Sequence, residues 1–230
     1  MREIVLDTET TGLDPYQGDR LVEIGCVELL NHMPTGQNFH RYINPERDMP
    51  EGAFAVHGLS EKFLKDKPLF SEIADDFVAF IGDSPLVIHN ASFDISFINA
   101  ELERVKRPIV ARERLIDTLL LARRKHPAGP NRLDDLCGRY GIDNSKRTKH
   151  GALLDAELLA EVYIELIGAR QAQLGLQAAG RSPTAVRAQN SVIRVRPAPL
   201  PSRLTESDRT AHREFVETLG EPIWRDYQKS

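Results

Sequence analysis

The sequence is poor in cysteine and contains no long hydrophobic run. Cys26 and Cys137 are the only cysteines among 230 residues, and they lie too far apart for a zinc or redox motif, so no disulfide framework is expected. Two thiols without a recognisable signal peptide indicate a reducing cytoplasm. No apolar stretch approaches the ~20 residues that cross a bilayer, which argues against membrane insertion.

Two further absences concern nucleotides and nucleic acids. The phosphate loop G-x-x-x-x-G-K-[ST] does not occur, so nothing in the sequence supports an NTPase. An excess of positive charge is also missing, because residues 1–168 carry 20 Lys and Arg against 28 Asp and Glu, a net charge of -8. Since basic side chains supply most nonspecific DNA affinity, such a domain is expected to bind DNA weakly by itself.

Charge divides the chain into three parts. Beyond residues 1–168, residues 169–203 contain 6 Arg and no acid, and residues 204–230 contain 4 basic and 6 acidic side chains. The middle part is rich in Pro, Ser, Ala and Arg without a sustained period, which is typical of a flexible linker. The last part has a helix start at Thr205 or Ser207 and too many large apolar groups for a solvated tail. We therefore predict a globular domain at residues 1–168, a basic linker at 169–203 and a short partner-binding tail at 204–230.

The first part begins with strands and continues with alternating strands and helices. Short turn-rich connections, including one at residues 31–36, suit an antiparallel meander, and the later alternation suits parallel crossovers. These patterns predict an α/β fold in which helices cover a mixed sheet. The expected strands are residues 3–7, 20–30, 37–44, 85–90 and 115–118, and the expected helices are 69–83, 92–105, 118–126, 131–140 and 151–168.

The first predicted strand ends in two carboxylates, within the segment DTETTG at residues 7–12. Positions i and i+2 of a strand point to the same face, so Asp7 and Glu9 project side by side. Adjacent carboxylates repel unless a cation or a proton lies between them. Taken alone, the pair is better explained by a strand that emerges into solvent, so a metal site requires further acids.

Two such acids lie at the starts of predicted helices. Asp94 in HNASFD and Asp155 in HGALLD each fall in a first turn, where an acid alone could simply complement the helix dipole. His150 can reach Asp155 only from the preceding loop, because five residues along a helix span ~500° of rotation. Carboxylates on separate elements can hold two hard divalent cations, and a histidine beside them can take a proton from water near neutral pH. The combination indicates a nuclease.

With DTETTG, HNASFD and HGALLD in this order, the sequence resembles the DEDDh family of 3′→5′ exonucleases, and within it the proofreading subunits of bacterial DNA polymerase III. The resemblance covers about residues 1–168 and implies a ribonuclease H-like fold with a mixed five-stranded sheet flanked by helices. It implies two divalent cations, Mg²⁺ or Mn²⁺, and release of mispaired 3′-terminal nucleotides as 5′-mononucleotides. The metal-binding acids would be Asp7, Glu9, Asp94 and Asp155, with Asp7 shared by both ions and His150 as the general base.

The resemblance also implies residues that hold the terminal nucleotide. His57, in the segment AVHGLS, would contact this nucleotide, and the alternative is a structural histidine in a loop. Thr8 and Leu13 would line the nucleotide pocket through backbone and apolar contact. Glu51, in MPEGAF, would touch the terminal sugar.

Partners follow from the resemblance as well. The substrate would be a single-stranded or frayed DNA 3′ end, and the tail would bind the catalytic alpha subunit of the polymerase, with Trp224 as the main anchor. QAQLGL at residues 171–176 is similar to peptides that bind the sliding clamp, with Gln171, Leu174 and Leu176 as contacts, although a frayed helix end explains it too. A small theta-like accessory subunit is a further candidate.

Some alternatives stay open at this point. An RNA-trimming exonuclease would use the same acids and histidine, although the linker and apolar tail favour the polymerase-associated form. A binding module without catalysis is disfavoured because all five chemical positions are filled. Basic clusters at 103–114, 123–125 and 146–150 either guide a strand toward the metals or form a solvated surface.

Overall fold

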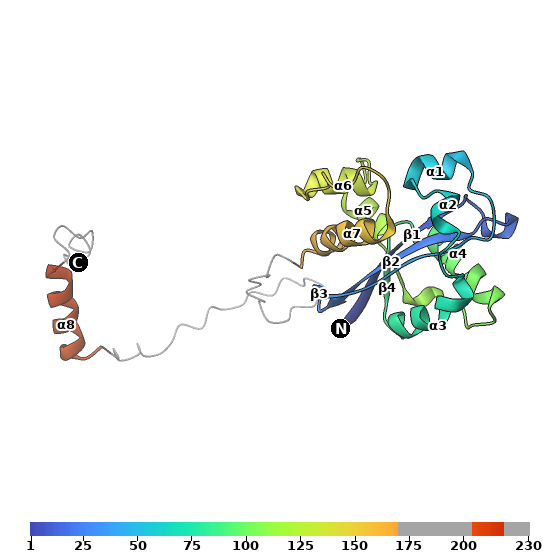
Figure 1. Cartoon of the computed structure of the whole chain (residues 1–230). Coiled ribbons are helices and arrows are strands. Elements are labelled where there is room, and N and C mark those ends of the chain that lie inside the picture. Colours follow the sequence, from blue (N-terminus) through green and yellow to red (C-terminus); the bar gives the residue numbers. More distant parts are fainter. Residues whose placement is uncertain (170–203, 219–230) are drawn as a thin grey trace, which may run out of the picture. The chain divides into compact units, whose positions relative to one another are not determined.

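The computed structural model describes residues 1–169 and 204–218, and these two ranges belong to separate units (Figure 1). The predictions for Gln171, Leu174, Leu176 and Trp224 lie outside the described residues. The strands of the first unit are β1 Arg2–Thr10, β2 Leu21–Leu30, β3 Met33–Tyr42, β4 Leu86–Ile88 and β5 Leu115–Asp117. Its α-helices are α1 Glu51–His57, α2 Glu61–Leu64, α3 Phe70–Ile81, α4 Ala91–Arg104, α5 Thr118–Lys125, α6 Leu133–Tyr140 and α7 Ala152–Leu166, with 3-10 turns at Pro15–Gln17 and Arg112–Arg114.

The five strands form one mixed sheet in the order β3-β2-β1-β4-β5. The β1–β2 and β2–β3 pairs are antiparallel, whereas the β1–β4 and β4–β5 pairs are parallel. The predicted meander followed by crossovers is therefore confirmed.

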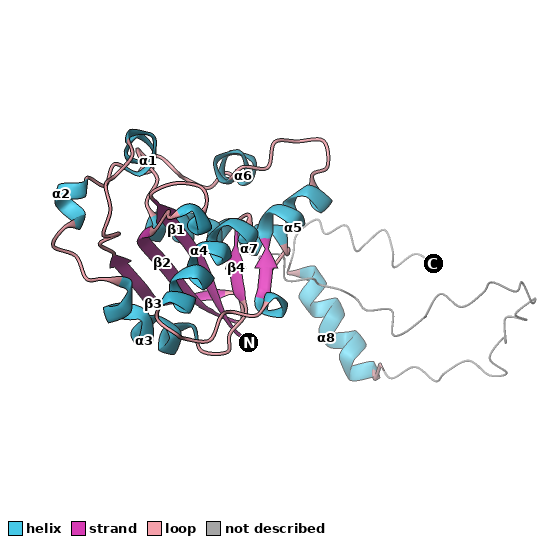
Figure 2. Ribbon diagram, turned by 90° about the vertical axis from the view of Figure 1, so that its right-hand side faces the viewer, coloured by secondary structure: helices cyan, strands magenta, loops and turns pink. Residues whose placement is uncertain are grey.

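Each face of the sheet is covered by its own apolar layer, because successive side chains of β1 point to opposite faces. Ile4 and Leu6 join a cluster with residues of α3 and α4, and Val5 joins a cluster with residues of α6 and α7. Helices flank the strands in Figure 2 as this partition requires. The ends of the strands, rather than their faces, are left to carry polar groups.

Helix α7 approaches the sheet closely at Gly25 of β2. Gly25 is the cross-strand partner of Asp7, and a Cβ at this position would overlap the backbone of Ala152 and Leu153 at the start of α7. The absence of a side chain therefore allows the first turn of α7 to rest on the sheet beside the end of β1. That contact places Asp155 near Asp7.

The β2–β3 hairpin is tighter than predicted. Asn31 and His32 form the turn with φ values of 52° and 64°, and β3 already begins at Met33. Residues 33–36, which were predicted as part of a turn, are thus strand. Pro34 is compatible with this because β3 lies at the sheet edge, where a missing N–H leaves no ladder bond unmade.

Helices α1 and α2 were not predicted. They are short and mostly exposed, so no sustained apolar period marks them. Helix α1 starts after Pro50, and Gly58, whose φ of 75° suits glycine, caps its C-terminal end. Because α1 ends with His57, that residue lies on a helix rather than in the loop considered from the sequence.

The described part of the second unit is a single helix, α8 Glu206–Glu217. The Thr205 side chain accepts a hydrogen bond from the backbone N–H of Asp208, so the predicted cap at Thr205 is confirmed. Phe215 on α8 is 61% exposed. Within residues 1–169 and 204–218, no helix has the length and apolarity needed to span a membrane.

Candidate active site

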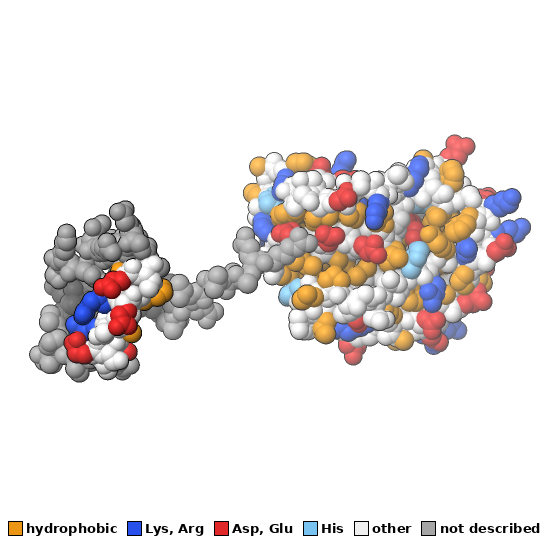
Figure 3. Space-filling model, turned by 60° about the vertical axis from the view of Figure 1, so that its left-hand side comes forward, with side chains coloured by type: hydrophobic (Ala, Val, Ile, Leu, Met, Phe, Trp, Pro, Cys, Tyr) orange, Lys and Arg blue, Asp and Glu red, His pale blue; other side chains and the backbone are white. Residues whose placement is uncertain are grey.

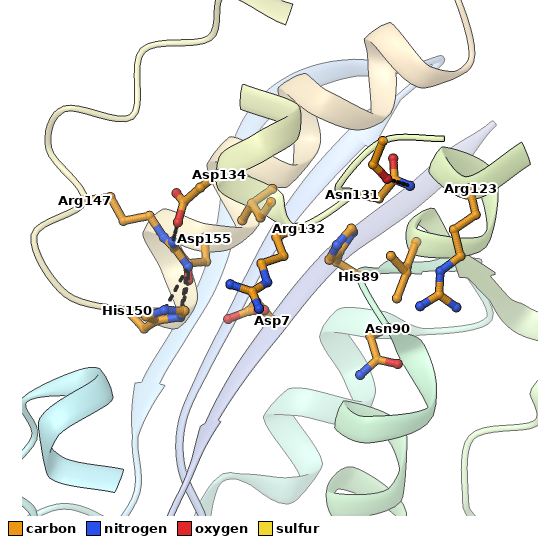
Figure 4. A pocket seen from close by; sticks show the side chains of 13 residues that line it. Asp7, His89, Asn90, Arg123, Asn131, Arg132, Asp134, Arg147, His150 and Asp155 are labelled. Carbon is orange, nitrogen blue, oxygen red and sulfur yellow. Dashed lines mark hydrogen bonds and ion pairs between the residues drawn. The ribbon is translucent and has the colours of Figure 1, made fainter. Parts of the chain in front are cut away.

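The four predicted acids and the predicted base gather at the carboxyl ends of β1 and β4. Asp7 and Glu9 lie near the end of β1, and Asp94 lies in the first turn of α4, which follows β4. Asp155 lies in the first turn of α7, and His150 lies in the loop before it. Figure 4 shows Asp7, His150 and Asp155 along one cavity of about 690 Å³.

The geometry of these groups fits a divalent cation. Ligand atoms of Glu9, His150 and Asp155 all lie within 4.8 Å of one another. Burial, followed by the charges of Asp94, Glu9 and Asp155, raises the pKa of Asp7 well above its usual range. Desolvated carboxylate oxygens at this density are the donors that hard cations prefer, and they are costly without positive charge between them.

The other acids on β1 and α4 titrate abnormally for the same reason. Burial, together with the charges of Asp155 and Glu23, raises the pKa of Glu9 to about 8. Burial raises the pKa of Asp94 to about 7, although hydrogen bonds, first among them that of the Thr8 hydroxyl, act to lower it. Their surroundings therefore oppose ionisation of these carboxyls, and a bound cation would favour their ionised form.

Asp155 differs because a guanidinium already pairs with it. Arg147 Nε donates to Asp155 Oδ1 at 2.6 Å, and Arg147 Nη2 donates to Asp155 Oδ2 at 2.7 Å. Burial alone would raise the pKa of Asp155, but the hydrogen bonds of Arg147 and His150 and their charges hold this pKa below its usual range. His150 Nδ1 lies 3.4 Å from Asp155 Oδ2, as the predicted approach from the loop requires.

Arg147 corrects the prediction for the basic cluster at 146–150. That cluster was expected either to guide DNA or to form a solvated surface, yet the Arg147 side chain is only 8% exposed and points inward to Asp155. The sequence signal was present in principle, because a buried acid needs a cation, but it did not specify which basic residue would supply it.

Two supporting contacts were not predicted from the sequence. The Thr8 hydroxyl donates to Asp94 Oδ1 at 2.6 Å, a role not predicted for Thr8. Asp117 at the end of β5 accepts hydrogen bonds from the backbone N–H groups of Asn90 and Ala91, so it fixes the start of α4 and with it Asp94. A carboxylate at the end of the predicted strand LIDT was the available hint.

A second cavity, of about 570 Å³, adjoins the acids and shares Asp7, His89 and His150 with the first. Its walls include Thr8, Leu13 and His57, three of the four residues predicted to hold the terminal nucleotide. Leu13 is 83% exposed, so its side chain is available at the rim. Glu51 is also exposed but does not line this cavity, although its neighbours Pro50 and Gly52 do.

His57 presents a polar atom to this second cavity. Its Nδ1 accepts a hydrogen bond of 3.0 Å from the backbone N–H of Leu59, so the proton of the neutral ring lies on Nε2. Burial lowers the pKa of His57, which favours this neutral ring. Nε2 is buried and, within the described residues, makes no hydrogen bond of good geometry, although the backbone of Thr10 is close.

Comparisons with known proteins agree with this site. The family described as Exonuclease (RNase_T) matches residues 4–163. The chain is 49% identical over 222 residues to the DNA polymerase III subunit epsilon of Rickettsia felis (strain ATCC VR-1525 / URRWXCal2), covering 95% of this chain and 97% of that relative. Exonuclease X in complex with 5′ overhanging duplex DNA aligns with a TM-score of 0.55 and 26% identity, over 73% of this chain and 92% of that one.

The fold is also shared with a more distant nuclease. The nuclease domain of 3′hExo, a DEDDh family member, bound to rAMP, aligns with a TM-score of 0.62 at 15% identity, over 73% of this chain and 92% of that one. The family match extends over most of the first unit. The matched range contains Asp7, Glu9, Asp94, His150 and Asp155. The chain therefore belongs to the exonuclease family.

Proposed function

We propose that this protein proofreads DNA as the 3′→5′ exonuclease subunit of a bacterial DNA polymerase III, removing mispaired 3′-terminal nucleotides as 5′-mononucleotides. The observation that carries this proposal is the convergence of four carboxylates and His150 beside a cavity large enough for a nucleotide. The similarity to a subunit epsilon along nearly the whole chain supports the polymerase context over RNA trimming. Its cellular location would be the cytoplasm, with the replicative polymerase.

Two divalent cations, Mg²⁺ or Mn²⁺, would be held by carboxylate oxygens at the end of the sheet. When bound, such ions supply charge stabilisation to the attacking and leaving oxygens of a phosphodiester. Asp7 suits a shared ligand because it is the acid whose pKa responds to all three of the others. The proposed ligands are Asp7, Glu9, Asp94 and Asp155.

His150 is proposed as the general base. Its side chain is 49% exposed, so a ring nitrogen can exchange its proton with solvent after each turnover. The backbone N–H of His150 donates to the carbonyl of Val56 at 3.3 Å, which ties the loop to α1 beside the nucleotide cavity. The base is thus positioned between the acids and the proposed substrate pocket.

The terminal nucleotide is proposed to occupy the second cavity. Thr8 and Leu13 would contact it through backbone and apolar surface, and His57 Nε2–H would donate to one of its oxygens. Glu51 is exposed and does not line this cavity. The backbone of its neighbours Pro50 and Gly52 would therefore make the contact with the terminal sugar.

The domain is proposed to depend on a tether for efficient delivery of DNA. Basic and acidic side chains are interspersed on the face of the first unit seen in Figure 3, and residues 1–168 have a net charge of -8. A partner bound to the tail would raise the local concentration of the DNA end without a basic surface. We assign this role to residues 204–230 and the polymerase alpha subunit, with clamp binding at 171–176 and a theta-like subunit as further contacts.

The test is the release of mononucleotides from a 3′-end-labelled single-stranded DNA and a matched RNA, with Mg²⁺ or EDTA. Wild type is expected to release DNA mononucleotides only with Mg²⁺, and Asp7→Ala is expected to abolish release. Asp76→Ala, at an exposed acid on α3, serves as the control for loss of one carboxylate. Faster release from RNA would contradict the proofreading function, and release in EDTA would contradict the metal dependence.

A further inference from the structure

Arg147 engages both oxygens of Asp155 as a planar fork. Figure 4 shows the two side chains facing each other. The two donor–acceptor distances are 2.6 and 2.7 Å, and the side chains of Arg147 and Asp155 are 8% and 2% exposed. A bidentate arginine–carboxylate pair is strong because two parallel, charge-assisted hydrogen bonds offset the cost of removing both groups from water. The guanidinium therefore occupies the region where a metal ion would meet Asp155.

The same guanidinium reaches the predicted base. Arg147 Nη2 lies 2.9 Å from His150 Nδ1. A ring protonated at Nδ1 donates toward Asp155 Oδ2, 3.4 Å away, whereas in the neutral ring protonated at Nε2, Nδ1 accepts from the guanidinium, which can only donate. In this second form the available lone pair of the ring is engaged, and one cation holds an acid and the base together.

Arg147 also donates to a second carboxylate, that of Asp134. Arg147 Nη1 donates to Asp134 Oδ2 at 2.6 Å, and the Asp134 side chain on α6 is 55% exposed. The guanidinium can therefore leave Asp155 while it keeps a charged partner. Residues 142–151, which carry Arg147 and His150, contain no helix or strand, so a shift of the Arg147 side chain toward Asp134 breaks no helical or sheet hydrogen bond.

We infer that Arg147 is a positioning residue whose guanidinium competes with a divalent cation for the oxygens of Asp155, and that it must withdraw from Asp155 for a divalent cation to bind there. This rests on the metal-dependent function proposed above. The guanidinium and the divalent ion compete for the same carboxylate, since two positive charges cannot share its oxygens at contact distance without strong repulsion. The fraction of molecules with Arg147 withdrawn then sets the apparent metal affinity.

The first experiment compares Mn²⁺ binding by calorimetry in the full chain. Arg147→Met keeps most of the stem but removes the charge, and it is expected to lower the Kd for Mn²⁺ about tenfold if Asp155 is free in about a tenth of wild-type molecules. Lys149→Met is the matched control, because Lys149 lies on the same loop and has the same charge but bonds the carbonyl of Ala55 instead. Its Kd is expected to stay within about twofold of wild type.

Stability separates competition from a merely structural role. Metal-free Arg147→Met is expected to unfold at a lower temperature than wild type, because Asp155 loses its cation, and saturating Mn²⁺ is expected to restore most of the difference. An arginine that only braces the loop would lower both the metal-free and the metal-bound midpoint and would weaken Mn²⁺ binding. Unchanged or weaker binding in Arg147→Met would overturn the inference.

A direct readout uses the Arg147 Nε–H resonance in ¹⁵N-labelled full chain, assigned by its absence in Arg147→Met. The signal is expected to be protected from exchange without metal and to lose protection on addition of Mg²⁺. A signal that stays unchanged while Mg²⁺ raises the thermal midpoint would overturn the role of Arg147 alone. A wild-type protein that binds neither Mn²⁺ nor Mg²⁺ would instead remove the proposed metal-dependent function and this inference with it.

Discussion

At the scale of single residues, the site is defined by a conflict between burial and charge. Glu9 and Asp94 are buried acids, and the nearby charges of other carboxylates add to the cost of ionising them. Asp155 escapes this conflict through Arg147. Buried carboxylates in close proximity are typical of a cation-binding site, because the bound cation offsets the free-energy cost of ionising them.

The first prediction concerns the pH dependence of the metal-free protein. The pKa of Glu9 is raised to about 8 and that of Asp94 to about 7, above values of ~4 in the unfolded chain. The stability that these protonated groups contribute is fully present below pH ~4 and is lost as pH rises through the folded pKa values. In EDTA, the thermal midpoint is therefore expected to fall between about pH 5 and about pH 9.

Circular dichroism melts across this range would measure that slope. Saturating Mg²⁺ is expected to flatten it, because the ion favours the ionised carboxylates, and Glu9→Gln is expected to flatten it in part without metal. Asp155 affects stability in the opposite direction, because its pKa is lowered in the folded protein. The stability that it contributes is present above the ordinary pKa of an aspartate and is lost as pH falls through the lowered value. A midpoint in EDTA that rises with pH would contradict the raised pKa values.

The second prediction distinguishes a base from a ligand at His150. If His150 accepts the proton of the attacking water, His150→Ala is expected to lower kcat about 10²–10⁴-fold while the Kd for Mn²⁺ changes little. His150 also lies close enough to Glu9 and Asp155 to bind the metal ion as a ligand. If it does, His150→Ala would weaken Mn²⁺ binding in parallel with the loss of kcat. Titration of Mn²⁺ into wild type and variant, beside single-turnover rates, separates the two.

At the scale of elements, the site depends on how α7 meets the sheet. The helix carries Asp155 in its first turn, and it can lie beside the end of β1 only because Gly25 has no side chain. Asp117 acts similarly on the other side by holding the start of α4. The acids are thus placed by the ends of rigid elements rather than by the loops.

The third prediction follows from the α7 contact. Gly25→Ala is expected to destabilise the protein by about 1–3 kcal/mol or more, because a methyl group would be forced into helix backbone, and to reduce Mn²⁺ affinity through displacement of Asp155. Gly138→Ala on α6 is the control, since its Cβ would meet nothing within 4 Å and the change should stabilise the helix by up to about 1 kcal/mol. Urea unfolding measures both, and equal midpoints would refute the close-approach argument.

At the scale of the whole molecule, the net charge differs between three parts of the chain. The domain is net -8, the stretch 169–203 has 6 Arg and no acid, and the last 27 residues are close to neutral. The match to the Rickettsia felis relative covers 95% of the chain and so includes most of this C-terminal region. A division of labour between a nuclease domain and a tether is consistent with that pattern.

The fourth prediction tests this division. Removal of residues 204–230 is expected to leave mononucleotide release from single-stranded DNA near the wild-type rate, because all five proposed catalytic residues lie within 1–168. Co-migration with the polymerase alpha subunit in gel filtration is expected to be lost, and Trp224→Ala in the full chain should weaken it. Undiminished association after the deletion would assign the contact to the nuclease domain instead.

Most strands and helices could be predicted from the sequence, because period-two and helical patterns are local. The segments DTETTG, HNASFD and HGALLD linked Asp7, Glu9, Asp94, His150 and Asp155 through their resemblance to a known family, although no local pattern showed which strands are neighbours. The short exposed helices α1 and α2 lacked a sustained apolar period and were missed. Two features became visible only in the folded protein: α7 rests on Gly25, and Arg147, rather than solvent, faces Asp155. Both outcomes depend on packing and desolvation between residues whose proximity is created by the fold, and neither leaves a periodic trace along the chain.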